Sequence, residues 1–217
     1  MYKTTPSYCM QGMTSSASKR ASLGVGFTVA FIVLTTAVLH GATLTTDQLI
    51  LLRLHARASP DLDRLAILFT ALGGLGGMIP PALLSAWLLF RRRKHSAAFG
   101  IICCVGGAYL LSVLCKLVVH RERPHLWAVL TPESDFSYPS GHALLSLSTV
   151  IAMVWVVWHT PYRLPALVLG GLFVVLVGLS RLYLGVHYPS DVLAGWLASG
   201  LWCTAVAWGV TTLEEKE

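Results

Sequence analysis

Three short polar segments near the ends of apolar runs carry the residues best suited to chemistry. They combine cations, histidines and one carboxylate, and they comprise Lys116 with Arg123-Pro124, then Pro139-Ser140-Gly141-His142, then Ser180-Arg181 with His187 and Asp191. Phosphoryl transfer needs such a set, because charge on the transferring oxygens must be met by fixed cations and N–H donors in a partly dry site. Lys116, Arg123 and Arg181 can supply this charge without a metal, so the sequence predicts neither a metal site nor a cofactor.

The two histidines of these segments suit different steps of such a reaction. His187 and Asp191 are four residues apart, so one helical turn would let the carboxylate fix the imidazole in one tautomer and stabilise its cation. This predicts His187 as a nucleophile and leaves His142 as a general acid for the leaving alkoxide. Ser140 and Gly141 directly precede an apolar run, where the free amides of a helix N-terminus can bind an anion.

Any one of these cations alone could be an interfacial side chain reaching toward lipid headgroups, and the functional interpretation depends on their joint occurrence. Neighbouring polar residues in the same loops are interpreted as solvated or indirectly supporting; they are His120, Arg121, Glu122, His125, Glu133 and Asp135. Leu49–Leu54 is expected to form an outer interfacial helix with Asp47 as a solvated flank, and neither is given a catalytic role.

The composition places these segments in a membrane protein. The 217 residues are 55% hydrophobic and only 12% charged, too apolar for a soluble domain. The apolar residues fall into runs near the roughly 20 residues that a helix needs to cross the bilayer. These runs are Leu23–Leu39, Leu65–Phe90, Ala97–Val119, Ala143–Trp158, Leu164–Leu179 and Val192–Val210. We therefore expect an all-α bundle of six transmembrane helices over residues 23–210, with tails at 1–22 and 211–217.

The distribution of basic residues predicts the orientation of this bundle. Arg91-Arg92-Arg93-Lys94 is the strongest cationic cluster in a short loop, which favours a cytoplasmic position for that loop and for both tails. The loops 40–64, 120–142 and 180–191 then lie outside, and the three polar segments meet at the extracytoplasmic interface. Lys19 and Arg20 before the first run are also compatible with a cleaved signal peptide, which would leave the later orientation unchanged.

Other features of the runs have structural interpretations. The glycines from Gly73 to Gly77 indicate close helix packing, and Pro80-Pro81 predicts a kink in the second span. Most tryptophans, among them Trp202, are expected to be interfacial anchors. The net charge of +6 comes from short clusters between apolar runs, so no nucleic acid partner is expected.

The polar segments resemble the three motifs of the type 2 phosphatidic acid phosphatase family, Lys-x6-Arg-Pro, Pro-Ser-Gly-His and Ser-Arg-x5-His-x3-Asp. Every fixed position is matched between Lys116 and Asp191. The resemblance implies that phosphate is bound by a set of five residues, namely Lys116, Arg123, Ser140, Gly141 and Arg181. It further implies that His187 becomes phosphohistidine, that His142 protonates the leaving group and that Asp191 supports His187, all without a metal.

The expected function is therefore hydrolysis of a lipid phosphomonoester or diphosphate within a bacterial inner membrane. The candidate substrates are phosphatidic acid, phosphatidylglycerol phosphate and undecaprenyl pyrophosphate, and the sequence selects neither among them nor an oligomeric state. Because the resembled family includes soluble vanadium haloperoxidases, a vanadate-dependent oxidoreductase is the second hypothesis. A lipid carrier or headgroup binder without hydrolysis is the third, although it has no need for the pair of His187 and Asp191.

Overall fold

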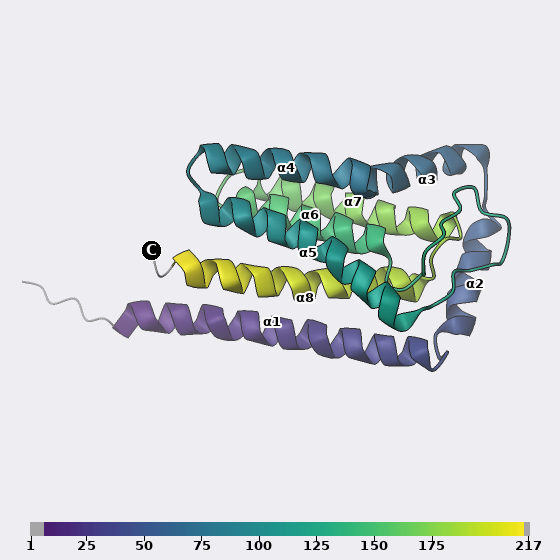
Figure 1. Cartoon of the computed structure of the whole chain (residues 1–217), viewed down its shortest axis with the longest axis horizontal. Helices are drawn as coiled ribbons and strands as arrows, with labels where there is room; N and C mark the ends of the chain where they lie inside the picture. Colours follow the sequence, from purple (N-terminus) through teal and green to yellow (C-terminus); the bar gives the residue numbers. More distant parts are fainter. Residues whose placement is uncertain (1–6, 215–217) are drawn as a thin grey trace, which may run out of the picture.

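A computed structural model describes the backbone of residues 7–214 and the side chains of residues 21–210. In this part of the chain all regular structure is helical (Figure 1). The helices are α1 (Ser7–Leu39), α2 (Leu44–His55), α3 (Pro60–Gly73), α4 (Leu75–Arg91), α5 (His95–Val119), α6 (Gly141–Val156), α7 (Arg163–Tyr183) and α8 (Pro189–Glu214). The all-α prediction is confirmed, whereas most of the expected tails at 1–22 and 211–217 lies outside the described side chains.

Most of these helices are long and apolar enough to cross a bilayer. Four stretches meet both criteria without a break, Ala21–Leu39, His95–Val119, Arg163–Tyr183 and Pro189–Val210. The pair α3 and α4 qualifies together as one span bent by 41°, and α6 is apolar but has only 16 residues. The chain is therefore built as a helical membrane protein, and the number of six spans stays a prediction.

The bend in the second apolar run lies earlier than the sequence predicts. Helix α3 ends at Gly73 and α4 begins at Leu75, while Pro80 and Pro81 both fall inside α4. A Cβ atom on Gly73 would come within 2.4 Å of the Val177 side chain, so the break is also a point of close packing against α7. The expected kink at the two prolines is thus wrong in position, whereas the close packing expected of the glycines is found at Gly73.

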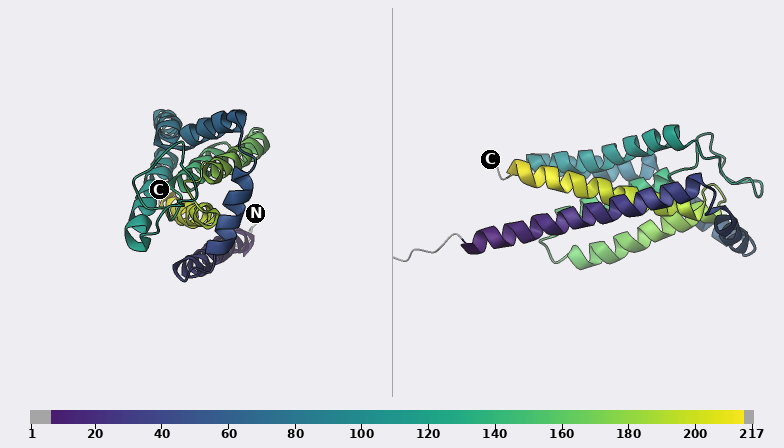
Figure 2. Two further views of the ribbon diagram at one scale, coloured as in Figure 1. Left: turned by 90° about the vertical axis from the view of Figure 1, so that its right-hand side faces the viewer. Right: turned by 90° about the horizontal axis from the view of Figure 1, so that it is seen from below.

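The bundle is organised around α6, which packs against α4, α5, α7 and α8. Helix α1 packs along α8 at the edge, and Figures 1 and 2 show α2 lying across the end of the bundle where α5 and α7 finish and α6 and α8 start. The loop between α5 and α6 folds over the same end (Figure 1). The opposite end carries the turn at 91–94, so the topology separates the cationic turn from the polar motifs, as the sequence predicts.

One tryptophan lies inside the bundle, against the expectation of an interfacial anchor. Trp202 is in the middle of α8, and its indole N–H donates to the Cys103 carbonyl of α5 over 2.9 Å. It can pack this closely because α5 has a glycine at the contact, where a Cβ on Gly107 would lie 2.1 Å from Trp202 Cζ2. The half-buried indole, with its N–H satisfied, therefore joins α5 to α8.

We expect Gly107→Ala to destabilise the bundle, because the added methyl would collide with the Trp202 ring; overpacking typically costs about 1–3 kcal/mol. Gly106→Ala is the matched control, since a Cβ there has no atom within 4 Å. Both substitutions bring the same gain in helix propensity, so their difference isolates the clash. Denaturation of the detergent-solubilised variants measures it, and equal stability of the two would contradict the packing described.

Candidate active site

The three polar motifs meet at one end of the bundle because four helices begin or end there. Lys116 lies in the last turn of α5 and Arg181 in the last turn of α7. Ser140 is the residue before α6, and Asp191 lies in the first turn of α8. The backbone joins two of these elements directly, since the Ser140 N–H donates to the Asp191 carbonyl over 3.0 Å. Segments far apart in the sequence are thereby brought into one cluster.

The three predicted cations share two carboxylates. Arg123 contacts both Glu133, at 2.6 Å, and Asp135, while Arg181 pairs with Glu133 and Lys116 pairs with Asp135. Burial raises the pKa of Glu133, but the guanidinium groups of Arg181 and Arg123 outweigh it and leave that pKa below its usual value. The cations therefore form a single anion-binding cluster, in which ionised carboxylates are already held.

His187 lies at the bottom of this cluster with no exposed surface. Its Nε2 is 3.2 Å from a guanidinium nitrogen of Arg123, and its Nδ1 is 3.3 Å from Ser137 Oγ. If Ser137 accepts from Nδ1–H, the Ser137 hydroxyl can donate to Asp191, whose Oδ2 is 2.5 Å away. This arrangement directs the lone pair of Nε2 toward the cations, as a nucleophile requires.

The sequence predicts a direct contact between His187 and Asp191, and the structure corrects this detail. The two side chains are 3.6 Å apart at their nearest atoms, and the Ser137 hydroxyl bonds to both. They are not stacked on one helical turn, because His187 precedes α8. Ser137 is thus a site residue that the motif analysis missed, although it lies only three positions before Ser140.

A helix-ending turn places His187. Helix α7 stops at Tyr183, and Gly185 follows with a φ of 69°, a conformation that favours glycine. The N–H groups of Gly185 and Val186 bond back to Leu182 and Arg181, which is the Schellman arrangement that closes a helix. The chain therefore reverses directly after Arg181 and returns His187 to the cluster.

The surroundings of His187 favour its neutral form. Burial lowers the pKa of His187 well below 6.5, and the neighbouring cations Arg181, Arg123 and Lys116 lower it further. A group whose pKa is lowered holds its proton only at lower pH, so the imidazole is unprotonated at neutral pH. The free Nε2 lone pair needed for attack is thus present in the resting protein.

The segment from Ser140 to His142 lies beside the cation cluster at the start of α6. Ser140 is fully buried, and its Oγ has no hydrogen bond partner among the described residues. A Cβ on Gly195 would lie 2.7 Å from the Ser140 carbonyl, so α8 approaches the start of α6 closely. His142 lines a cavity of about 390 Å³ together with Lys116 and Glu133. The predicted general acid thus shares a cavity with one predicted phosphate ligand.

Two residues expected to be peripheral, Asp47 and Glu133, lie beside this site. Asp47 is only 3% exposed, so its interpretation as a solvated flank is wrong. It pairs with Arg121, which in turn contacts Asp191 at 2.6 Å. Glu133 likewise lies within the cation cluster. Asp47 and Glu133 belong to no motif. The only signal in the sequence is the excess of arginine in a loop expected to face outward, which could have indicated that these arginines need carboxylate partners.

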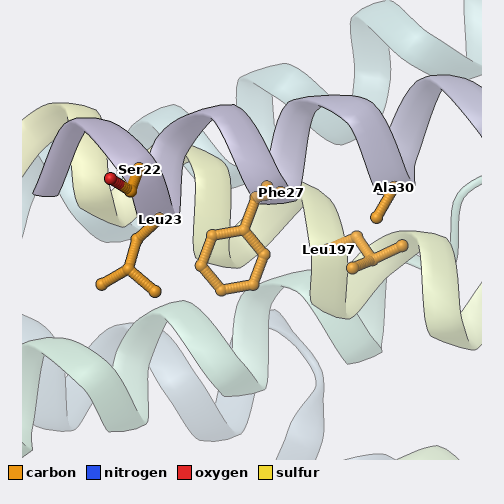
Figure 3. A pocket seen from close by; sticks show the side chains of 6 residues that line it. Ser22, Leu23, Phe27, Ala30 and Leu197 are labelled. Atoms are coloured by element: carbon orange, nitrogen blue, oxygen red, sulfur yellow. The ribbon is translucent and has the colours of Figure 1, made fainter. Parts of the chain in front are cut away.

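A separate groove between α1 and α8 carries no such chemistry. It has a volume of about 660 Å³ and is lined by Leu23, Phe27, Ala30 and Leu197, with Ser22 as its polar residue (Figure 3). No residue of the three motifs takes part in its lining. It is an apolar seam between two membrane helices and is not a candidate for the active site.

Comparison with known proteins gives this geometry a family context. Residues 83–215 match the sequence model of the PAP2 superfamily. Phosphatidylglycerophosphatase B from Bacillus subtilis is 30% identical over 170 residues, covering 76% of this chain and 83% of the relative. An undecaprenyl-diphosphatase from Sulfolobus acidocaldarius is 34% identical over 128 residues, covering 54% and 57% of the two chains.

The fold is also similar to a solved structure. The crystal structure of the transmembrane PAP2-type phosphatidylglycerolphosphate phosphatase from Bacillus subtilis superimposes with a TM-score of 0.77 at 29% sequence identity. The match covers 89% of this chain and 96% of that protein. The likeness therefore extends well beyond the three motifs to almost the whole bundle.

Proposed function

The chain belongs to the PAP2 superfamily of membrane lipid phosphatases, and we propose that it hydrolyses its lipid phosphate through a phosphohistidine at His187. The observation that carries this proposal is the position of the His187 Nε2, which is buried within the cation cluster and 3.2 Å from Arg123. An uncharged nucleophile surrounded by cations is suited to attack an anionic phosphorus centre. The membrane-spanning helices disfavour a vanadate-dependent oxidoreductase, which the resembled family includes as soluble proteins, and a carrier has no need for a nucleophile.

Phosphate binding falls to the residues around His187. Lys116, Arg123 and Arg181 would meet the three non-bridging oxygens, displacing the carboxylates that they hold in the resting protein. The Ser140 hydroxyl, which has no partner among the described residues, and the backbone beside Gly141 would donate further hydrogen bonds at the α6 N-terminus. These groups supply charge stabilisation of the kind that a metal gives in other phosphatases, so the reaction proposed needs no metal.

Two steps complete the reaction. First, the His187 Nε2 lone pair forms a bond to phosphorus while the bond from phosphorus to the lipid oxygen breaks, and His142, which must be protonated when the anionic substrate is bound, gives its proton to that oxygen. Second, His142 takes a proton from water as the water attacks phosphorus, which releases inorganic phosphate and restores neutral His187. Asp191, reached through Ser137, stabilises the positive charge that the ring carries between the two steps.

Phosphatidylglycerol phosphate is the first candidate substrate, because the relative named for that activity aligns over 83% of its own length. Undecaprenyl diphosphate is the second, because a relative named for it is 34% identical, although the alignment covers only 57% of that protein. Phosphate release from both lipids and from phosphatidic acid, assayed side by side, would decide between them.

The protein is integral to a membrane, and we propose a bacterial inner membrane with the active site on its periplasmic side. The support is the cationic turn at 91–94, which lies at the opposite end of the bundle from the motifs (Figure 1). Short loops rich in Lys and Arg stay in the cytoplasm. The cations of the site are paired with carboxylates, so they do not weigh against this orientation; they are Lys116, Arg121, Arg123 and Arg181.

The two histidines should respond differently to substitution. His187→Ala should form no covalent phosphoenzyme with any substrate, since its nucleophile is gone. His142→Ala should still be phosphorylated by an aryl phosphate, whose phenolate leaves without protonation, and should lose about a hundred- to ten-thousandfold of its activity on a lipid substrate. Acid-quenched trapping of labelled phosphoenzyme in excess chelator, beside turnover on both substrates, measures the two effects.

His125→Ala is the matched control for this experiment, because His125 is exposed in the same loop and outside the cluster; its activity should be unchanged. A labelled phosphoenzyme in His187→Ala would contradict the assignment of the nucleophile. Equal losses in the rate of phosphoenzyme formation from the aryl phosphate and from the lipid in His142→Ala would contradict its role as general acid.

The orientation predicts a labelling pattern in intact cells. In a background without the native cysteines, Leu130→Cys, in the loop at the site end, should react with a membrane-impermeant maleimide. Arg93→Cys, in the opposite turn, should react only after the cells are permeabilised. The reverse pattern would place the active site in the cytoplasm.

A further inference from the structure

A second buried charge cluster lies next to His187, on the side away from the cation cluster. Arg121 donates to Asp191 Oδ1 over 2.6 Å and to Ser190 Oγ over 2.7 Å, and its other terminal nitrogen donates to Asp47 Oδ2 over 2.9 Å. Its guanidinium carbon is 4.1 Å from the centre of the Tyr188 ring. All of these side-chain contacts are to residues outside the predicted phosphate-binding set.

Asp47 completes this cluster from α2. Its carboxylate accepts from the Ser190 N–H over 3.0 Å and from the Ser190 hydroxyl over 2.5 Å, in addition to Arg121. A buried carboxylate is costly unless it is paired, and here each of its oxygens has a donor. The short helix at the membrane surface is therefore bonded to the first turn of α8, where Asp191 lies.

These contacts determine the orientation of the Asp191 carboxylate relative to His187. Its Oδ1 is held by Arg121, and its Oδ2 accepts from the Tyr188 N–H over 2.8 Å and from the Ser137 hydroxyl. With both oxygens fixed, the carboxylate can turn neither away from His187 nor out of its plane. Removal of Arg121 would free one oxygen and leave two carboxylates buried without a cation.

We propose that Arg121 and Asp47 are positioning residues for phosphoryl transfer, and that they hold Asp191 in the orientation in which it supports His187. This inference rests on the proposed role of His187 as nucleophile. It gives α2 a part in the reaction, because Asp47 anchors Arg121 from that helix. If the contact between α2 and α8 served folding alone, its removal would not slow phosphoryl transfer in protein that remains folded.

The test separates the chemical step from phosphate binding. In Arg121→Gln, single-turnover formation of phosphoenzyme from an aryl phosphate should slow by about ten- to a hundredfold, the range typical of partners that orient a reacting group. The inhibition constant for inorganic phosphate, which binds to the cations without bonding to His187, should stay within about threefold of wild type, since Lys116, Arg123 and Arg181 are intact. Arg121→Lys, which keeps the charge but not the two-sided geometry, should recover part of the rate.

A double variant tests the link to α2. Adding Asp47→Asn to Arg121→Gln should restore part of the lost rate, because it removes one of the two carboxylates left without a cation. Arg64→Gln is the control, since its pair with Asp61 is exposed on the same side of the bundle and should not affect the rate. Asp47→Asn alone keeps the contact between Arg121 and Asp191, and it should slow phosphorylation several-fold with unchanged inhibition by inorganic phosphate.

Two results would overturn the inference. One is a wild-type rate of phosphorylation in folded Arg121→Gln, or in Asp47→Asn should the first variant fail to fold. The other is a loss of affinity for inorganic phosphate as large as the loss of rate, which would indicate general damage to the site. If the wild-type protein itself forms no phosphohistidine, the proposed nucleophile fails instead, so the two failures are distinguishable.

Discussion

Charge buried at one end of an apolar bundle is the constraint on which the site depends. Lys116, Arg123 and Arg181 lie close together where water is largely excluded, and an uncompensated charge there would be costly. The resting protein balances these cations with Glu133 and Asp135. We propose that a substrate phosphate replaces these carboxylates because it brings comparable negative charge, so that the same electrostatic requirement would stabilise the fold and select the ligand.

The helical architecture explains how such a cluster can be rigid. Each polar motif lies at a helix end, and these ends are held together by the close approach of Gly195 to Ser140 and by the hydrogen bond from the Ser140 N–H to the Asp191 carbonyl. The apolar lengths of the helices pack in the bilayer, while their ends carry the charged groups. His187, the proposed nucleophile, is thus held in place by the packing of the bundle, and the loop between α5 and α6 supplies Arg123 and Glu133 to the site.

The sequence predicts the helical class and the meeting of the motifs well, because apolar length and exact motif spacing are local properties. It fails where a contact depends on tertiary packing. Ser137 lies between His187 and Asp191 only because α8 starts after the histidine, and Asp47 is buried only because α2 folds over the end of the bundle. The bend at Gly74 likewise reflects packing of α3 on α7, which the prolines further along α4 do not reveal.

The central claim is that the Nε2 atom of His187 is the nucleophile that bonds to phosphorus, and that three cations surround it. An experimental structure of the protein with orthovanadate tests it most directly, because vanadate adopts the five-coordinate geometry of the transferring phosphorus. We expect the vanadium to be bonded to the His187 Nε2, and its oxygens to be contacted by Lys116, Arg123 and Arg181 in place of Glu133. Vanadium bonded to His142, or held by the cations away from either histidine, would contradict it.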